Sequence, residues 1–162
     1  MINRPIFSKR RSLFRTFARS ALCFGCSVVA FAVIASGTIA SGAHAEDLTQ
    51  FSRSIGLKDT ASFVETVSAI RSTGRLPNKY LTKQEASRKG WRPGANICEA
   101  IPNQWIGGDV FRNLEGRLPK KNYREADLEP TCKSRGAKRL VFSGKNEIYV
   151  TVDHYETFTR VP

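Results

Sequence analysis

The chain has few of the residues that metal and cofactor chemistry requires. Its 162 residues include only four cysteines, two histidines and one methionine. Four cysteines are too few for a disulfide-packed scaffold, and Cys98 and Cys132 have no histidine close by that could complete a zinc site. A Walker phosphate loop, a Gly-x-Ser-x-Gly elbow and a dinucleotide fingerprint are also missing. Chemistry without a metal or cofactor is the class that remains.

Repeats, low-complexity tracts and Pro/Gly/Ser-rich linkers are likewise absent from residues 46–162, which indicates one domain. With 41% hydrophobic and 10% aromatic residues, the composition excludes a disordered or collagen-like chain. Acidic residues are in the minority, since 14 Asp and Glu face 26 Lys and Arg and give a net charge of +12. Polyanions are therefore the expected partners, with a membrane surface as the alternative.

The N-terminus has the pattern of a secretory signal peptide. Residues 1–20 carry six basic residues and no acid, residues 21–40 carry no charge, and Ala43 and Ala45 flank His44. This pattern predicts a signal peptide over residues 1–45, cleaved after Ala45. Because the uncharged run is long, an uncleaved membrane anchor is the alternative. Cleavage and export would leave a mature chain of net charge +6, in which Cys98 and Cys132 are expected to form a disulfide.

Helix signals occupy the first half of the mature chain. Residues 46–60 show none and are expected to be a flexible segment. Capping boxes at Ser62–Glu65 and Thr82–Glu85 predict two helices, ended near Gly74 and Gly90. A third short helix is expected over 96–101. No strongly amphipathic cationic helix is present, which argues against a membrane-active toxin.

Strand signals dominate from residue 105 onward. The expected strands are 105–111, 123–128, 139–143, 147–152 and a short edge at 157–159. Within the first, Gly107-Gly108 indicates a bulge or a close backbone approach. Helices followed by strands predict an α+β domain with helices on one face of an antiparallel sheet.

Four sets of residues could carry chemistry, and each also has an ordinary structural explanation. His154 is the one histidine after Ala45 and could act as a proton donor, or be a surface residue. Glu125 shares a strand face with Asp127 and could be a general base, or a solvated charge. Arg135 and Arg139 could bind phosphate, or form an exposed basic run. Lys83 stands at a helix start, where the macrodipole disfavours a cation unless an anion binds there.

Taken together, these segments resemble the barnase and binase family of small secreted bacterial ribonucleases that prefer guanine. The resemblance covers about residues 60–162, and its matching positions are 76–83, 85–86, 90–91, 106–111, 115–119, 124–127, Arg135, Arg139 and 153–159. It implies N-terminal helices packed on a five-stranded antiparallel sheet that holds RNA on its open face. It implies one ribonuclease domain over residues 61–162.

The resemblance also assigns roles. Glu125 matches the general base and His154 the general acid of transesterification to a 2′,3′-cyclic phosphate, which is then hydrolysed. Arg135, Arg139 and Lys83 match the cations around the scissile phosphate. The base-binding residues implied by the family are Phe111, Arg112, Asn113, Glu115 and Tyr155. No metal or cofactor is expected, because RNA supplies its own 2′-hydroxyl nucleophile.

Some positions depart from the family pattern. Leu114 replaces an arginine and Arg112 replaces a serine, which bears on the guanine preference and on docking of a barstar-like inhibitor protein. Cys98 and Cys132 are not typical of the family, but the implied fold makes them neighbours. The expectation is a secreted, monomeric endoribonuclease acting on single-stranded RNA. A secreted protein that binds RNA or other polyanions without cleaving them is the alternative.

Overall fold

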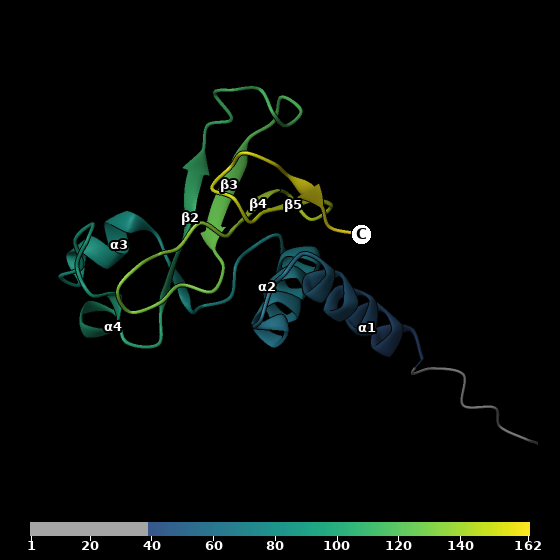
Figure 1. Cartoon of the computed structure of the whole chain (residues 1–162), viewed down its shortest axis with the longest axis horizontal. Helices are drawn as coiled ribbons and strands as arrows, with labels where there is room; N and C mark the ends of the chain where they lie inside the picture. The colour runs from purple at the N-terminus through teal and green to yellow at the C-terminus, as the bar shows by residue number, and fades with distance from the viewer. Residues whose placement is uncertain (1–38) are drawn as a thin grey trace, which may run out of the picture. The chain divides into compact units, whose positions relative to one another are not determined.

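The computed structural model describes residues 39–162, so the predicted signal peptide lies largely outside the described residues (Figure 1). Four helices and six strands follow one another along this part of the chain. The helices are α1 (Ile39–Ser54), α2 (Thr60–Thr73), α3 (Lys83–Arg88) and α4 (Ile97–Ala100). The strands are β1 (Tyr80–Leu81), β2 (Trp105–Phe111), β3 (Tyr123–Asp127), β4 (Arg139–Ser143), β5 (Glu147–Thr151) and β6 (Thr159–Arg160). The predicted α+β class is confirmed.

Residues 46–60 were expected to be a flexible segment, but the larger part of this segment is helical in the structure. Helix α1 runs to Ser54, and the chain turns directly into α2. Leu48 and Leu57 are only 2% and 5% exposed and pack with Phe63 of α2. Burial of these leucines therefore holds the segment in place.

The predicted cleavage point after Ala45 falls inside α1. Among the helices of residues 39–162, none is long and apolar enough to cross a membrane.

Local capping explains where the next helices begin and end. The N-cap of helix α2 is Asp59, three residues before the predicted Ser62, and its side chain accepts the Ser62 N–H at 3.0 Å. The helix ends as predicted at Gly74, whose φ of 75° is easily adopted only by glycine. The predicted capping box of α3 is confirmed: Thr82 and Glu85 each accept the other's backbone N–H. Helix α4 follows Asn96 as its N-cap.

The sheet has one strand more than predicted and is mixed. Its strands lie in sequence order β1 to β6, and β1 pairs parallel to β2 while all other pairs are antiparallel. Strand β1 has only two residues, too few for a periodic pattern. The predicted bulge in β2 is confirmed by a register shift between Gly107 and Asp109. A Cβ on Gly107 would lie 2.6 Å from Tyr80, so glycine is required for the close packing there.

The two faces of the sheet have different surroundings. On one face, Leu140, Phe142, Ile148 and Val150 form a core with α1 and α2. On the other, Tyr123 and Val141 pack with aromatic side chains, and Glu125 and Asp127 point the same way as Tyr123 because strand residues alternate. Helices α1 and α2 therefore leave the face of Glu125 free for a site.

The predicted disulfide between Cys98 and Cys132 is present, with 5.0 Å between the Cα atoms. Beside it, the backbone N–H of Ile97 donates to the carbonyl of Cys132 at 2.8 Å. The bond therefore joins the start of α4 to the loop before Arg135.

Candidate active site

Glu125 lies in the middle of β3 and is 7% exposed. Its two carboxylate oxygens have different donors. The Lys83 ammonium donates to Oε1 at 2.8 Å, and the Tyr155 hydroxyl donates to Oε2 at 2.7 Å. The carboxylate is thereby held in one orientation by residues from α3 and from the segment after β5.

The surroundings of Glu125 keep it ionised. Burial raises the pKa of this carboxyl, but the hydrogen bonds from Lys83 and Tyr155 and the charges of Lys83 and Arg135 outweigh burial. The pKa of Glu125 consequently lies below its ordinary value. Burial raises the pKa of Tyr155, and the neighbouring Glu125 raises it further, so the phenol stays protonated and can donate.

Lys83 is stabilised at its helix start by two carboxylates. Its backbone N–H donates to Asp109 at 2.9 Å, while its ammonium reaches Glu125. The unfavourable charge predicted from the sequence is therefore offset within the protein. No bound anion is needed to explain it.

Asp127, two residues after Glu125, holds the two predicted arginines. It is 0% exposed. Arg135 donates to both of its oxygens, at 2.8 and 2.7 Å, and the Arg139 Nε lies 3.0 Å from Oδ1. Hydrogen bonding to Asp127 and the charge of that carboxylate raise the pKa of Arg135 despite the opposing effect of burial. Sequence reasoning placed Asp127 beside Glu125 but gave it no role.

The two arginines differ in access. The Arg139 side chain is 4% exposed, and it also donates to the carbonyls of Arg135 and Lys138 at 3.1 and 2.8 Å. The Arg135 side chain is 23% exposed. Arg135 can therefore contact a ligand directly, whereas Arg139 chiefly supports the loop that carries Arg135.

His154 and Tyr155 follow β5 on an unusual backbone. Their φ angles are 59° and 75°, in the left-handed region that costs energy for residues other than glycine. His154 is exposed, and its ring centroid lies 5.0 Å from that of Tyr155. Since Tyr155 also bonds Glu125, one residue connects the predicted base and the predicted acid.

The backbone of this segment is held by Asp153, which sequence reasoning missed as a site residue. Its carboxylate accepts from the hydroxyls of Thr151 at 2.8 Å and Thr157 at 2.6 Å, and from the Thr157 N–H at 3.0 Å. These hydrogen bonds lower the pKa of Asp153 to about 2. The Tyr155 N–H in turn donates to Thr151 at 2.9 Å. Asp153 and the threonines together stabilise the segment that presents His154.

The predicted base-binding residues surround a cavity of about 410 Å³. Its lining consists of Phe111, Arg112, Asn113, Leu114, Glu115, His154, Tyr155 and Glu156. The rings of Phe111 and Tyr155 stack at a centroid distance of 5.3 Å. Leu114 is 86% exposed. The structure thus brings all five predicted residues to one cavity next to His154.

Asn113 and Arg117 make polar contacts that shape the wall of this cavity. The Asn113 amide donates to the Leu118 carbonyl at 2.7 Å and accepts the Leu118 N–H at 3.1 Å, which closes the loop. Arg117, which sequence reasoning did not single out, lies 3.3 Å from Glu115 and 2.9 Å from Glu156. A guanidinium therefore links the carboxylates of two segments that line the cavity.

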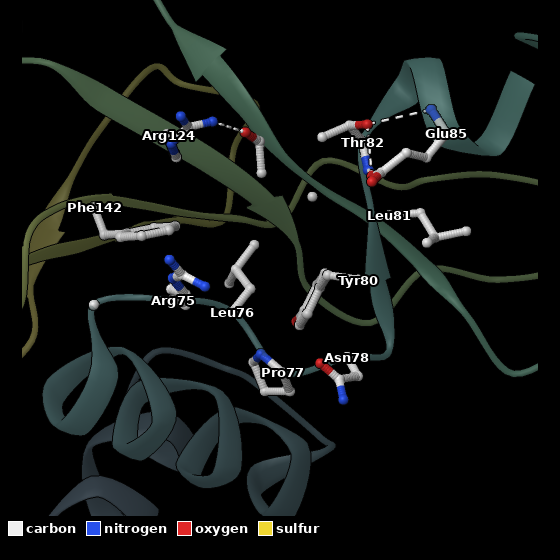
Figure 2. Close-up of a pocket in the computed structure, with 13 residues that line it drawn as sticks. Arg75, Leu76, Pro77, Asn78, Tyr80, Leu81, Thr82, Glu85, Arg124 and Phe142 are labelled. Atoms are coloured by element: carbon white, nitrogen blue, oxygen red, sulfur yellow. Dashed lines mark hydrogen bonds between the residues drawn. The ribbon is translucent and has the colours of Figure 1, made fainter.

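A separate cavity of about 540 Å³ lies away from these residues (Figure 2). It is lined by Arg75, Leu76 and Tyr80 and by Arg124 and Phe142 of the sheet. Because Arg124 and Glu125 are consecutive in β3, they point to opposite faces. Arg124 donates to the carbonyl of Gly108 (Figure 2). This cavity is therefore distinct from the candidate site.

Within residues 39–162, no three His, Cys, Asp or Glu side chains come together as metal ligands.

The chain is similar to proteins of known activity. A family model described as ribonuclease matches residues 64–162. A ribonuclease of Bacillus intermedius is 40% identical over 146 residues, which make up 80% of this chain and 90% of that protein. A ribonuclease of Bacillus pumilus is 50% identical over 91 residues, or 54% of this chain and 56% of that relative.

Two further matches are shorter. The guanyl-specific ribonuclease St of Saccharopolyspora erythraea is 42% identical over 55 residues, or 32% of this chain and 54% of that protein. A solved structure, ribonuclease Sa2 with guanosine-2′-cyclophosphate, is 42% identical and has a TM-score of 0.32, over 35% of this chain and 63% of that chain.

Proposed function

Because the chain belongs to the ribonuclease family of barnase and binase, and is an endoribonuclease, we propose a mechanism in which Glu125 and His154 move the protons. The substrate would be single-stranded RNA. The 2′-oxygen would attack the adjacent phosphorus, which releases the 5′-oxygen of the next nucleotide and leaves a 2′,3′-cyclic phosphate. Hydrolysis of the cyclic ester would follow with the proton transfers reversed.

Glu125 would act as the general base. A base must be deprotonated before it can accept the 2′-hydroxyl proton, and the lowered pKa of Glu125 satisfies this requirement near neutral pH. Hydrogen bonds from Lys83 and Tyr155 hold the carboxylate in one orientation. Because these two hydrogen bonds already fix the Glu125 carboxylate, it would lose little conformational freedom on reaching the transition state.

His154 would act as the general acid. Imidazole is suited to this step because its ordinary pKa of about 6.5 lies near neutrality. The side chain is exposed next to Tyr155 and lines the cavity of Phe111 and Glu115. A nucleotide in that cavity would place its 3′-phosphate between His154 and Glu125.

Lys83 and Arg135 would stabilise the phosphate. Negative charge grows on the phosphoryl oxygens in the transition state, and cations that are already in place lower the barrier. Arg135 is fixed by Asp127 and remains 23% exposed. Arg139, at 4% exposure, would contribute its positive charge and hold the Arg135 loop.

We propose that the cavity of Phe111, Arg112, Asn113, Glu115 and Tyr155 takes guanine. Phe111 and Tyr155 provide aromatic surface, and a carboxylate such as Glu115 can accept from N1–H and N2–H of guanine, which no other RNA base presents together. One relative, ribonuclease St, is named as guanyl-specific, which agrees with this assignment. An acidic, barstar-like inhibitor would meet the exposed Lys83 and the partly exposed Arg135.

We also propose that the enzyme is exported as a monomer after loss of residues 1–45. The disulfide of Cys98 and Cys132 agrees with an oxidising compartment. Sequencing the N-terminus of the exported protein tests the cleavage point.

The observation that carries the mechanism is the pair of hydrogen bonds that Lys83 and Tyr155 make to a buried Glu125, with the ring of Tyr155 next to that of the exposed His154. The test uses the dinucleotides GpA and ApA in EDTA, with products separated by chromatography. Wild type should yield guanosine 2′,3′-cyclic phosphate and cleave GpA faster than ApA. Glu125→Gln and His154→Ala should each lose cleavage by a factor of at least about 100 while retaining RNA binding. Full activity of either variant would refute its assigned role.

A further inference from the structure

The Arg135 loop, residues 129–138, is tied to the connection between α1 and α2. At the start of the loop, the Glu129 carboxylate accepts the backbone N–H groups of Lys58 and of Asp59, the latter at 2.7 Å. We propose that Glu129 is a positioning residue, which sets where Arg135 stands beside the scissile phosphate. This inference rests on the role proposed above for Arg135.

An ion pair joins the two ends of the Arg135 loop. The Lys138 ammonium donates to the second oxygen of Glu129 at 2.6 Å and to the carbonyl of Gly56 at 2.8 Å. Both side chains are largely withdrawn from water, at 17% exposure for Glu129 and 27% for Lys138. Burial raises the pKa of Glu129, but Lys138 and the two backbone N–H groups outweigh burial and keep that pKa below its ordinary value. With three donors around it, the ionised carboxylate is held in one orientation.

The backbone of Glu129 gives a second indication that contacts impose its place. Its φ of 51° lies in the left-handed region, which costs energy for a residue other than glycine. Residues in that region persist only where their surroundings determine them, and they gather at functional sites. The three hydrogen bonds to the Glu129 carboxylate are contacts of this kind.

The position of Lys138 is passed to Arg135 through the backbone. The Leu128 N–H donates to the Lys138 carbonyl at 3.1 Å and closes the base of the loop. Arg139 donates to the carbonyls of Lys138 at 2.8 Å and of Arg135 at 3.1 Å. A shift of Lys138 would therefore move Arg139 and the backbone of Arg135. Asp127 orients the Arg135 guanidinium, but the backbone that carries this side chain depends on the contacts at the base of the loop.

The connection between α1 and α2 is a firm anchor for the loop. Leu57 is 5% exposed in the main core, and its N–H donates to the Ser52 carbonyl at 2.9 Å. Ser52 is itself 0% exposed. Residues 56–59, which receive Glu129 and Lys138, precede the ribonuclease domain predicted over residues 61–162. The N-terminal segment therefore supports the site through the Arg135 loop.

The test compares Glu129→Ala with Glu65→Ala. Glu65 is the matched control, because its carboxylate also pairs with a lysine at 2.6 Å, Lys79, but it belongs to α2 and does not line the nucleotide cavity. Rates on GpA are measured well below the Tm of every variant. Glu129→Ala should lower kcat on the order of 10-fold and leave KM nearly unchanged, because a misplaced cation chiefly weakens binding of the transition state. Glu65→Ala should retain the wild-type kcat.

A double-mutant cycle with Arg135→Ala separates positioning from general destabilisation. If Glu129 acts through Arg135, Glu129→Ala should cause little further loss of kcat in an Arg135→Ala background. An equal loss in both backgrounds, or a wild-type kcat for Glu129→Ala, overturns the proposal. Lys138→Met removes the ammonium but keeps a long side chain, and it takes the place of Glu129→Ala in the cycle if that variant does not fold. A wild-type kcat for Lys138→Met would then overturn the proposal.

Amide hydrogen exchange keeps this result separate from the proposed function. Exchange of the Leu128 N–H, which closes the base of the loop, should be severalfold faster in Glu129→Ala than in wild type or Glu65→Ala. Unchanged exchange overturns the hold of Glu129 on the loop even if RNA is cleaved as proposed. If exchange is faster but Arg135→Ala keeps the wild-type kcat, the phosphate role of Arg135 fails, whereas the hold of Glu129 on the loop stands.

Discussion

At the scale of single residues, Tyr155 connects three parts of the site. Its hydroxyl donates to Glu125, its ring stacks on Phe111, and it follows His154 directly. A carboxylate that accepts a hydrogen bond is favoured in its charged form, which lowers its pKa. Tyr155 therefore influences both the ionisation of Glu125, the proposed base, and the shape of the cavity that we propose binds the nucleotide.

We predict that Tyr155→Phe moves the acid limb of the pH profile of kcat/KM to higher pH. The substitution removes a hydrogen bond that favours ionised Glu125, so the pKa of Glu125 should rise and the base should be protonated at a higher pH. Tyr149→Phe is the matched control, because the Tyr149 hydroxyl donates to Glu147 and not to Glu125. Initial rates on GpA across the acidic range measure the shift. A shift of the limb to lower pH would contradict the assigned contact.

At the scale of elements, the segment between β5 and β6 is shaped by side chains and not by a regular ladder. Asp153 accepts three hydrogen bonds from Thr151 and Thr157. His154 and Tyr155, which follow Asp153, have positive φ angles. Residues in that region persist only where the surrounding contacts determine them. The local stability of this segment should therefore depend on the ionisation of one carboxylate.

We predict that Asp153→Asn lowers both the Tm and kcat/KM at neutral pH. The folded pKa of Asp153 is about 2 against an ordinary value of 3.8, so its stabilising contribution is fully present above about pH 4. It is lost as the pH falls through about 2. The difference in Tm between wild type and variant should therefore narrow between pH 4 and pH 2. Thr157→Ser keeps the hydroxyl donor and should behave like wild type; a Tm difference that is independent of pH would exclude the carboxylate as its cause.

At the scale of the whole molecule, the disulfide joins parts of the chain that are 34 residues apart. It links α4, which packs in the small core of Trp91 and Ile106, to the loop that leads into Arg135. The main core of α1, α2 and the sheet does not include either cysteine. The bond therefore stabilises the fold around the loop before Arg135 without taking part in proton transfer.

We predict that a Cys98→Ser/Cys132→Ser variant unfolds at lower temperature but retains cleavage of GpA. Chain-entropy arguments for a loop of this length suggest a loss on the order of 3–4 kcal/mol. Thermal melts with and without reductant measure the effect. Reductant should lower the Tm of wild type and leave that of the variant unchanged. Equal melting of both proteins under oxidising conditions would argue against the bond.

Local patterns along the chain were sufficient to predict much of the fold. The Thr82–Glu85 capping box, the stop at Gly74 and the strands 105–111 and 139–143 depend on residues within a few positions of one another. The charge balance likewise indicated a polyanion partner, whereas the roles of Glu125, His154 and the arginines were implied only by the resemblance to the barnase and binase family. These features follow from sequence because backbone capping and side-chain alternation act over short distances.

Contacts between distant residues were decided only by the tertiary structure. Lys83 meets Glu125 across 42 positions, and Tyr155 meets it across 30. The pairing of β1, the burial of Leu48 and the complete burial of Asp127 likewise depend on what folds against them. A sequence pattern states which residues are charged or apolar, but the pKa of a carboxylate and the exposure of an arginine depend on neighbours that only the folded chain brings close.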